Sequence, residues 1–137
     1  KIELRFDANQ GYSEQEVIRF VENTRAAKLE LVEQPTPKKD FDLLGRITKK
    51  VPVPVMADES LMTLKDVFHL TSKGCIDMIN IKLMKCGGIY NARKIAAIAQ
   101  GINADRVQLN TVARPPADRS AVAPPRDSSL LYSHSQT

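Results

Sequence analysis

Hydrophobic and polar positions follow a repeating pattern through the first hundred residues of the chain. Short apolar runs alternate with longer segments in which apolar residues recur every three or four positions. The short runs are rich in β-branched residues and predict strands, whereas the longer segments predict helices that pack one face on a sheet. The predicted strands are residues 2–6, 29–32, 53–57 and 77–82, and the helices that follow them begin near residues 13, 40, 63 and 89.

Capping and turn residues mark the ends of these elements. Ser13 opens a capping-box pattern, and Asp40 and Thr63 are suited to cap the next two helices. Pro54 lacks a backbone donor, so we place it at the entry of the third strand. The glycine pair at 87–88 supplies the turn between the fourth strand and its helix. The pattern therefore predicts four consecutive βα units.

The repeat covers residues 1–101, and residues 102–137 differ in character. This second segment is rich in Pro, Ala, Ser and Arg, and only residues 106–113 show weak alternation. One interpretation is a disordered tail. We favour another, a reading-frame change or misjoined exon near residue 102, because the repeat stops where a further strand is due. The expected organisation is an α/β region at 1–101 and an irregular C-terminal tail at 102–137.

The length of the chain limits the fold. Its 137 residues can form one hydrophobic core but fall short of the roughly 250 residues of a closed (β/α)8 barrel. The fold is then either a small open α/β sheet or a piece of a larger one, and the start at Lys1 directly before a strand favours a piece. Open sheet edges in such a piece predict self-association as a homo-oligomer, or poor solubility.

Composition and charge narrow the classes of partner. The hydrophobic content of 42% is ordinary for a soluble domain, and the net charge of +4 comes from interspersed charges without a basic block. We therefore expect no nucleic-acid binding. No apolar run approaches the roughly 18 residues of a membrane span, so we expect no membrane partner. Cys75 and Cys86 are expected to be free thiols in a reducing cytosol, which predicts a cytoplasmic location.

Ionisable residues stand at the end of each predicted strand. Asp7, Glu33, Asp58 and Lys82 follow one another at intervals of 26, 25 and 24 residues. A βα unit has about this length, and parallel strands bring their C-terminal ends together. A single acid at a strand end is usually a helix cap or a solvated loop residue, but four in phase predict one shared site.

Three carboxylates from separate strands suit a hard divalent cation, most naturally Mg²⁺. Lys82 is then a candidate base that removes a proton next to a substrate carboxylate through an enediolate, its pKa lowered by the cation and by partial burial. Lys85 is the alternative base, but Lys82 is in phase with the acids. Glu59 alternates to the other face and is expected to support the site rather than bind the ion.

Several stretches together resemble the muconate-lactonising subgroup of the enolase superfamily. They are Asp7-Ala8-Asn9-Gln10-Gly11, Glu33-Gln34-Pro35, Ala57-Asp58-Glu59-Ser60 and Ile81-Lys82-Leu83-Met84-Lys85-Cys86-Gly87-Gly88. Within the subgroup, the first and last stretches look most like dipeptide epimerases of the L-Ala-D/L-Glu type. Related cycloisomerases and o-succinylbenzoate synthases share the same framework. The resemblance covers residues 1 to about 101.

The resemblance implies a partial (β/α)8 TIM-type barrel with its site at the C-terminal strand ends. It implies that Asp7, Glu33 and Asp58 bind Mg²⁺ and that Lys82 is the acid/base residue on one face of a dipeptide or carboxylate substrate. In the family a Lys-x-Lys motif on the preceding strand serves the opposite face, and an Asp-x-Asp on later strands holds the substrate ammonium. Neither motif is recognisable here, so no substrate-binding residue is assigned.

Three hypotheses follow for the function. The first is a fragment of a magnesium-dependent isomerase, an epimerase or racemase of the enolase superfamily, with a muconate cycloisomerase-like or o-succinylbenzoate synthase-like activity as the alternative. The second is a truncated, non-catalytic product that binds a divalent ion or a partner. The third is a different small α/β binding domain in which the phase of the acids is coincidental.

Overall fold

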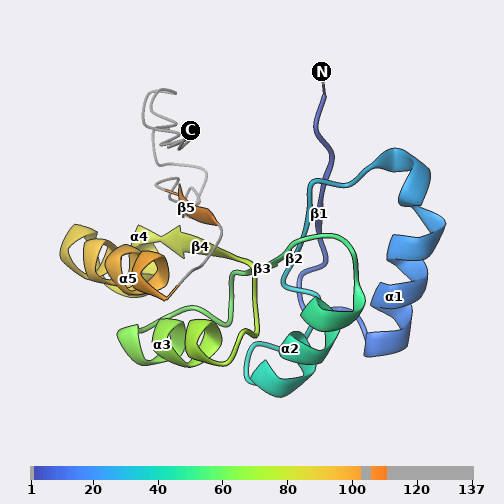
Figure 1. The fold of residues 1–137 in the computed structure, drawn as a ribbon. Coiled ribbons are helices and arrows are strands. Elements are labelled where there is room, and N and C mark those ends of the chain that lie inside the picture. Colours follow the sequence, from blue (N-terminus) through green and yellow to red (C-terminus); the bar gives the residue numbers. More distant parts are fainter. Residues whose placement is uncertain (1, 103–105, 111–137) are drawn as a thin grey trace, which may run out of the picture.

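A computed structural model describes residues 2–102 and 106–110 and shows a parallel sheet with helices along its outer side (Figure 1). In chain order its elements are β1 (Arg5–Asp7), α1 (Glu14–Asn23), the 3-10 helix η1 (Arg25–Ala27), β2 (Leu31–Glu33), α2 (Phe41–Lys50), β3 (Val55–Ala57), α3 (Leu64–Ser72), β4 (Met78–Lys82), α4 (Leu83–Cys86), α5 (Ile89–Gly101) and β5 (Arg106–Asn110). Each strand pairs in parallel with the next strand along the chain. This order confirms the predicted α/β fold of consecutive βα units.

The strand β5 lies inside the segment for which the sequence predicts an irregular tail. All five of its residues pair with β4, from Met78 opposite Arg106 to Lys82 opposite Asn110. The regular repeat therefore continues past residue 101, although the sequence analysis finds no convincing fifth unit there. The alternation at 106–113 was weak because only Val107 and Leu109 carry it. Residues 111–137 lie outside the described residues, so the prediction for the rest of the tail stays a prediction.

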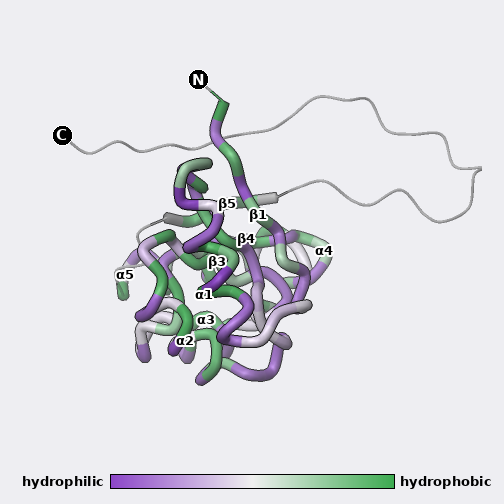
Figure 2. Tube along the Cα trace, turned by 90° about the vertical axis from the view of Figure 1, so that its right-hand side faces the viewer, coloured by the Kyte–Doolittle hydropathy of each residue, from purple (hydrophilic) through white to green (hydrophobic). Residues whose placement is uncertain are grey.

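The main hydrophobic core lies between the helices and the outer face of the sheet. Buried residues of α1, α2, α3 and α5 form one cluster with the outward side chains of the strands, among them Val32, Val55, Ile79 and Ile81. Figure 2 shows the alternation of hydrophobic and hydrophilic residues along the chain that produces these faces. Burial of a strand residue of this size stabilises the fold by roughly 1.5–3 kcal/mol.

A second, smaller cluster lies on the inner face of the sheet. It consists of Leu31 on β2, Met56 on β3 and Met78 on β4, all at most 3% exposed. Met56 and Met78 are direct neighbours in the register of the two strands. Because side chains alternate along a strand, the residues two positions later on each strand also face inward. The inner cluster therefore lies directly below the inward-facing side chains at the C-terminal ends of β2, β3 and β4.

Local signals in the sequence correspond closely to the observed helix starts. Ser13 and Thr63 each form a complete capping box, and Asp40 accepts a hydrogen bond from the backbone of Leu43. The end of the fourth strand differs from the prediction, since the short helix α4 comes between Lys82 and the glycine pair. Gly87, with φ +80°, ends α4 in the left-handed conformation. This extra turn places Lys85 beside the strand end.

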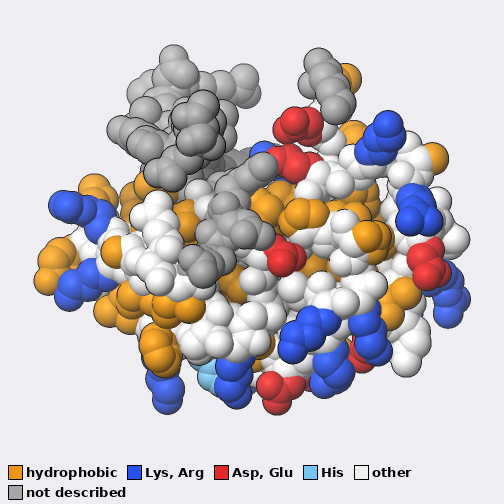
Figure 3. All heavy atoms as spheres, viewed as in Figure 1, with side chains coloured by type: hydrophobic (Ala, Val, Ile, Leu, Met, Phe, Trp, Pro, Cys, Tyr) orange, Lys and Arg blue, Asp and Glu red, His pale blue; other side chains and the backbone are white. Residues whose placement is uncertain are grey.

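The surface combines charged helix faces with exposed hydrophobic side chains. Figure 3 shows hydrophobic side chains exposed on the side formed by α3, α4 and α5, where Phe68, Met84, Ile89 and Tyr90 are each more than half exposed. The predicted self-association is not tested by these features and stays a prediction. Both cysteines are buried free thiols. None of the helices in the described part of the chain is long and apolar enough to cross a membrane.

Asp77 accepts a hydrogen bond from the first backbone donor of β3, which follows Pro54. Pro54 offers no donor, and the next backbone N–H, that of the fully buried Val55, donates to Oδ2 of Asp77 at 2.8 Å. Removing this acceptor with Asp77→Ala leaves a buried donor unpaired. We expect a loss of about 1–3 kcal/mol in the free energy of unfolding, measured by urea denaturation. Asp77→Asn keeps an accepting oxygen and is the matched control; an equal loss in both variants would contradict this account.

Candidate active site

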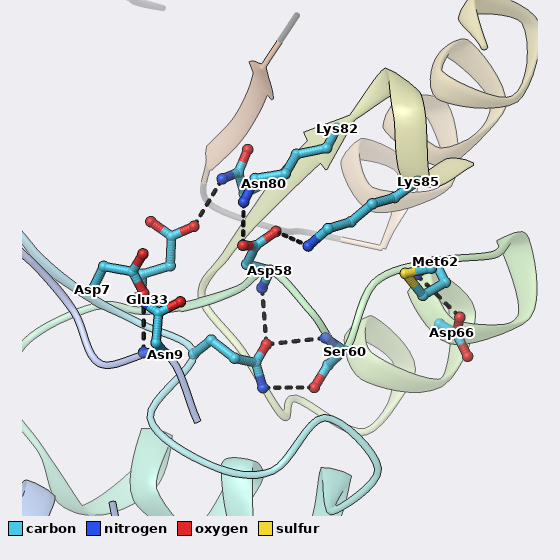
Figure 4. A network of polar contacts seen from close by, with 11 residues as sticks. Asp7, Asn9, Glu33, Asp58, Ser60, Met62, Asp66, Asn80, Lys82 and Lys85 are labelled. Atoms are coloured by element: carbon cyan, nitrogen blue, oxygen red, sulfur yellow. Dashed lines mark hydrogen bonds and ion pairs between the residues drawn. The ribbon is translucent and has the colours of Figure 1, made fainter. Parts of the chain in front are cut away.

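The inner face of the sheet carries polar side chains directly beyond its apolar base. Glu33 follows Leu31 by two residues, Asp58 follows Met56, and Asn80 follows Met78, so all three side chains share the inner face. Asp7 on β1 is level with Glu33 in the strand register. Figure 4 shows these side chains at the ends of neighbouring strands, together with Lys82 and Lys85. The four residues predicted from the sequence therefore face one region.

The strand register places these residues at successive heights. Glu33 is level with Met56, so Asp58 lies two residues beyond it. Ala57 pairs with Ile79, which makes Asp58 level with Asn80 and sets Lys82 a further two residues beyond. Such a stagger is a property of barrel-type sheets, in which strands tilt across the axis. Asn80 consequently lies at the level of Asp58, two residues beyond the level of Glu33 and two before Lys82.

Asp58 is the most buried charge of the site, with only 2% of its surface exposed. Its two carboxylate oxygens accept hydrogen bonds from two different lysines: Oδ2 from Nζ of Lys82, and Oδ1 from Nζ of Lys85 at 2.8 Å. The two lysine side chains are each 22% exposed. A buried carboxylate needs such compensation, because leaving its charge unpaired would be costly.

Glu33 and Asp7 make different contacts. Oε1 of Glu33 accepts a hydrogen bond from the Asn80 side-chain amide at 2.8 Å, and Asp7 accepts one from the backbone N–H of Asn9 at 3.1 Å. The amide of Asn80 must turn its nitrogen to the carboxylate, so its oxygen Oδ1 points away. That oxygen is buried and has no partner among the described residues. It leaves one unused acceptor within the site.

The charges of the site act on one another. Burial raises the pKa of Glu33, opposed by the hydrogen bond from Asn80, while the charges of Asp7 and Asp58 raise it further and that of Lys82 lowers it. Burial lowers the pKa of Lys82, but the hydrogen bond and charge of Asp58, with the charge of Glu33, outweigh burial and raise it overall. The expected lowering of the pKa of Lys82 concerns the site with a bound cation, so it stays a prediction.

The side chains of the site are of the chemical type that binds a divalent cation, but their positions in this structure do not form a binding site. Carboxylates on three successive strands are the oxygen donors that Mg²⁺ prefers. Within residues 2–102 and 106–110, however, no three His, Cys, Asp or Glu side chains are grouped closely enough to hold a metal ion as they stand. The ammonium groups of Lys82 and Lys85 occupy the oxygens of Asp58 that a cation would need. The metal role of the acids stays a prediction.

Two residues of this region were missed by sequence reasoning. Asn80 interrupts an otherwise apolar strand between two isoleucines and lies two residues before Lys82, which is a usable signal for an inward polar residue. Gln34 is fully buried beneath the site, and no pattern of spacing or polarity marks it. Glu59 is close enough for its charge to raise the pKa of Lys82, and the supporting role expected of it stays a prediction.

The chain is similar to known proteins in sequence and in fold. Residues 1–114 match the family described as enolase C-terminal domain-like. The chain is 47% identical over 103 residues to an L-Ala-D/L-Glu epimerase of Clostridium acetobutylicum, covering 73% of this chain and 28% of that protein. It is 41% identical over 100 residues to a chloromuconate cycloisomerase of Cupriavidus necator, covering 73% of this chain and 27% of that protein. The chain thus spans less than a third of the length of these relatives.

Among solved structures, the fold resembles the dipeptide epimerase of Enterococcus faecalis in its complex with Mg and the dipeptide L-Leu-L-Tyr. The TM-score is 0.75 at 38% sequence identity, over 80% of this chain and 31% of that chain. Since most of the chain matches both the family and the fold of its solved members, the chain belongs to the enolase C-terminal domain-like family.

Proposed function

We propose that this chain carries part of the active site of a magnesium-dependent isomerase that epimerises a dipeptide such as L-Ala-D/L-Glu. The observation that carries the proposal is the contact of Lys82 with the buried Asp58, on the same inner face as Glu33. A lysine and several carboxylates at one set of strand ends suit proton abstraction next to a carboxylate. The similarity to dipeptide epimerases supports the substrate class.

In the proposed reaction, the neutral amine of Lys82 takes the α-proton of the substrate. The C–H bond breaks and an N–H bond forms. The electron pair of the broken C–H bond moves toward the substrate carboxylate, which becomes an enediolate. Asp7, Glu33 and Asp58 would hold Mg²⁺, which when bound supplies positive charge that stabilises the substrate carboxylate and opposes protonation of Lys82. Release of Lys82 from Asp58, which it contacts in this structure, would free the carboxylate for the ion and the amine for the proton.

Epimerisation also needs a proton delivered to the opposite face of the substrate. Lys82 ends β4 and Lys85 lies in the adjoining α4, so both approach from one side. We assign the opposite proton donor to the Lys-x-Lys strand that the family places before β1. With Lys82 alone, the chain would exchange the α-proton for one from solvent without changing the configuration.

A cycloisomerase-like activity is the second candidate, favoured by the 41% identity to the chloromuconate cycloisomerase. Both reactions need the same acids and the same lysine, and they differ in the substrate. A dipeptide offers the α-proton of its C-terminal residue, beside the free carboxylate, whereas a muconolactone offers a proton of the carboxymethyl side chain attached to its lactone ring. Presenting both compounds to the same sample in deuterated water therefore separates the two candidates.

Divalent-cation binding tests the metal role of Asp58. We expect the chain to bind Mg²⁺ saturably in calorimetric titration, and Asp58→Asn to weaken this binding at least tenfold because one ligand charge is lost. Asp42→Asn, which removes an exposed carboxylate in the first turn of α2, is the matched control and should bind as the wild type does. A folded wild-type chain that binds no cation would contradict the proposed metal site.

Isotope exchange tests the role of Lys82. With Mg²⁺ and L-Ala-D-Glu in deuterated water, we expect the wild-type chain to introduce deuterium at the α-carbon of the glutamate, followed by NMR. Lys82→Met should reduce the rate by at least a hundredfold, since the proton acceptor is removed. Lys85→Met should retain exchange, because Lys85 contacts Asp58 and is not the proposed proton acceptor. The roles of the two lysines are reversed if Lys85→Met shows the larger loss.

A further inference from the structure

The side chain of Gln34 links two loops that carry proposed ligands of the site. Gln34 follows Glu33 at the end of β2 and has no exposed surface. Its oxygen Oε1 accepts hydrogen bonds from the backbone N–H groups of Asp58 at 2.9 Å and Ser60 at 3.0 Å. Its nitrogen Nε2 donates to the carbonyl of Thr36 at 2.9 Å and to Oγ of Ser60 at 2.8 Å.

This carboxamide has no spare hydrogen-bonding capacity. An amide oxygen accepts two hydrogen bonds and an NH₂ group donates two, and all four are made here. The orientation of the amide is fixed by its partners, because the backbone N–H groups of Asp58 and Ser60 can only donate. Rotating the amide by half a turn would set its donors against theirs. The side chain therefore holds one defined position.

The backbone of Gln34 extends these links to β3 and to the loop that follows β1. Its N–H donates to the carbonyl of Met56 at 2.8 Å, and its carbonyl accepts from the N–H of Gln10 at 2.7 Å. Its φ of +39° lies in the left-handed region, which is unfavourable for a residue with a side chain. Such a conformation persists where the surroundings over-determine it, and it is found preferentially at functional sites.

We propose that Gln34 is a positioning residue that sets the Asp58 carboxylate relative to Glu33 for binding of the cation. Glu33 is its covalent neighbour, and the Asp58 backbone is held by its oxygen, so one buried group fixes both proposed ligands. This inference rests on the proposed function, since it concerns the same cation site. Partners of this kind typically change metal affinity by about 10–100-fold.

Gln34→Met tests the inference, because methionine has a similar shape and makes none of the four hydrogen bonds. We expect hydrogen exchange at the amides of Asp58 and Ser60, followed by NMR, to become at least tenfold faster. Val55 lies on β3, just before Asp58, and its amide donates to Asp77 instead of Gln34, so its exchange should stay unchanged. Titration with Mg²⁺ should show at least tenfold weaker binding than in the wild type.

A further variant separates positioning from general stability. Thr48→Val removes hydrogen bonds from α2 to the carbonyls of Leu44 and Cys75, away from the site, and should leave Mg²⁺ affinity unchanged even where it lowers stability. If Gln34→Met does not fold, Gln34→Asn, which is shorter by one methylene, is measured against the same criteria.

The outcomes distinguish this inference from the proposed function. If the wild type binds no Mg²⁺, the proposed function fails. If the wild type binds and Gln34→Met binds equally well, the proposed function stands and the role of Gln34 is overturned. A loss of affinity in Thr48→Val as large as that in Gln34→Met would likewise overturn it, because the effect would then follow stability. Faster exchange with weaker binding in Gln34→Met alone supports it.

Discussion

The alternation of side chains along parallel strands is the constraint on which the rest of this structure depends. One face of β2, β3 and β4 enters the core beneath the helices, and the other face holds first an apolar residue and then a polar one. Moving a strand by a single residue would send Glu33 or Asp58 into the helical core and expose a valine or an alanine in its place. The register that protects the core therefore also positions the site.

The contacts of Asp58 affect both the stability of the site and the protonation state of Lys82. Burial requires that the charge of Asp58 be compensated, and the two lysines meet this requirement. The same contact keeps Lys82 in its charged form, in which it cannot accept a proton. The ion pair that stabilises buried Asp58 therefore opposes the reactivity of Lys82. A group that displaces Lys82 from Asp58 would also make the lysine easier to deprotonate. Natural active sites commonly carry such a conflict between local stability and chemistry.

The sequence was most informative where a local rule acts alone. Capping boxes, the proline at the strand entry and the spacing of the acids each depend on neighbouring residues or on one repeat length, and the structure reproduces the elements they predict. It was least informative where distant segments meet. The stagger of the strands, the pairing of Asp58 with Lys85 and the buried contacts of Gln34 arise from tertiary packing. Strand β5 was missed because its alternation rests on two residues, while its pairing with β4 supplies the rest.

The order of the strands in the sheet has a consequence for how the chain acquires its structure. Each strand pairs with the one made just before it during synthesis. Pairing partners are therefore separated by little more than one repeat, which keeps the entropy lost on closing each loop small. A long-range exception is the hydrogen bond from Arg5 to Gln108, which joins the first and last strands of the sheet. The growing chain can add one unit at a time, with each new strand templated by an edge that already exists.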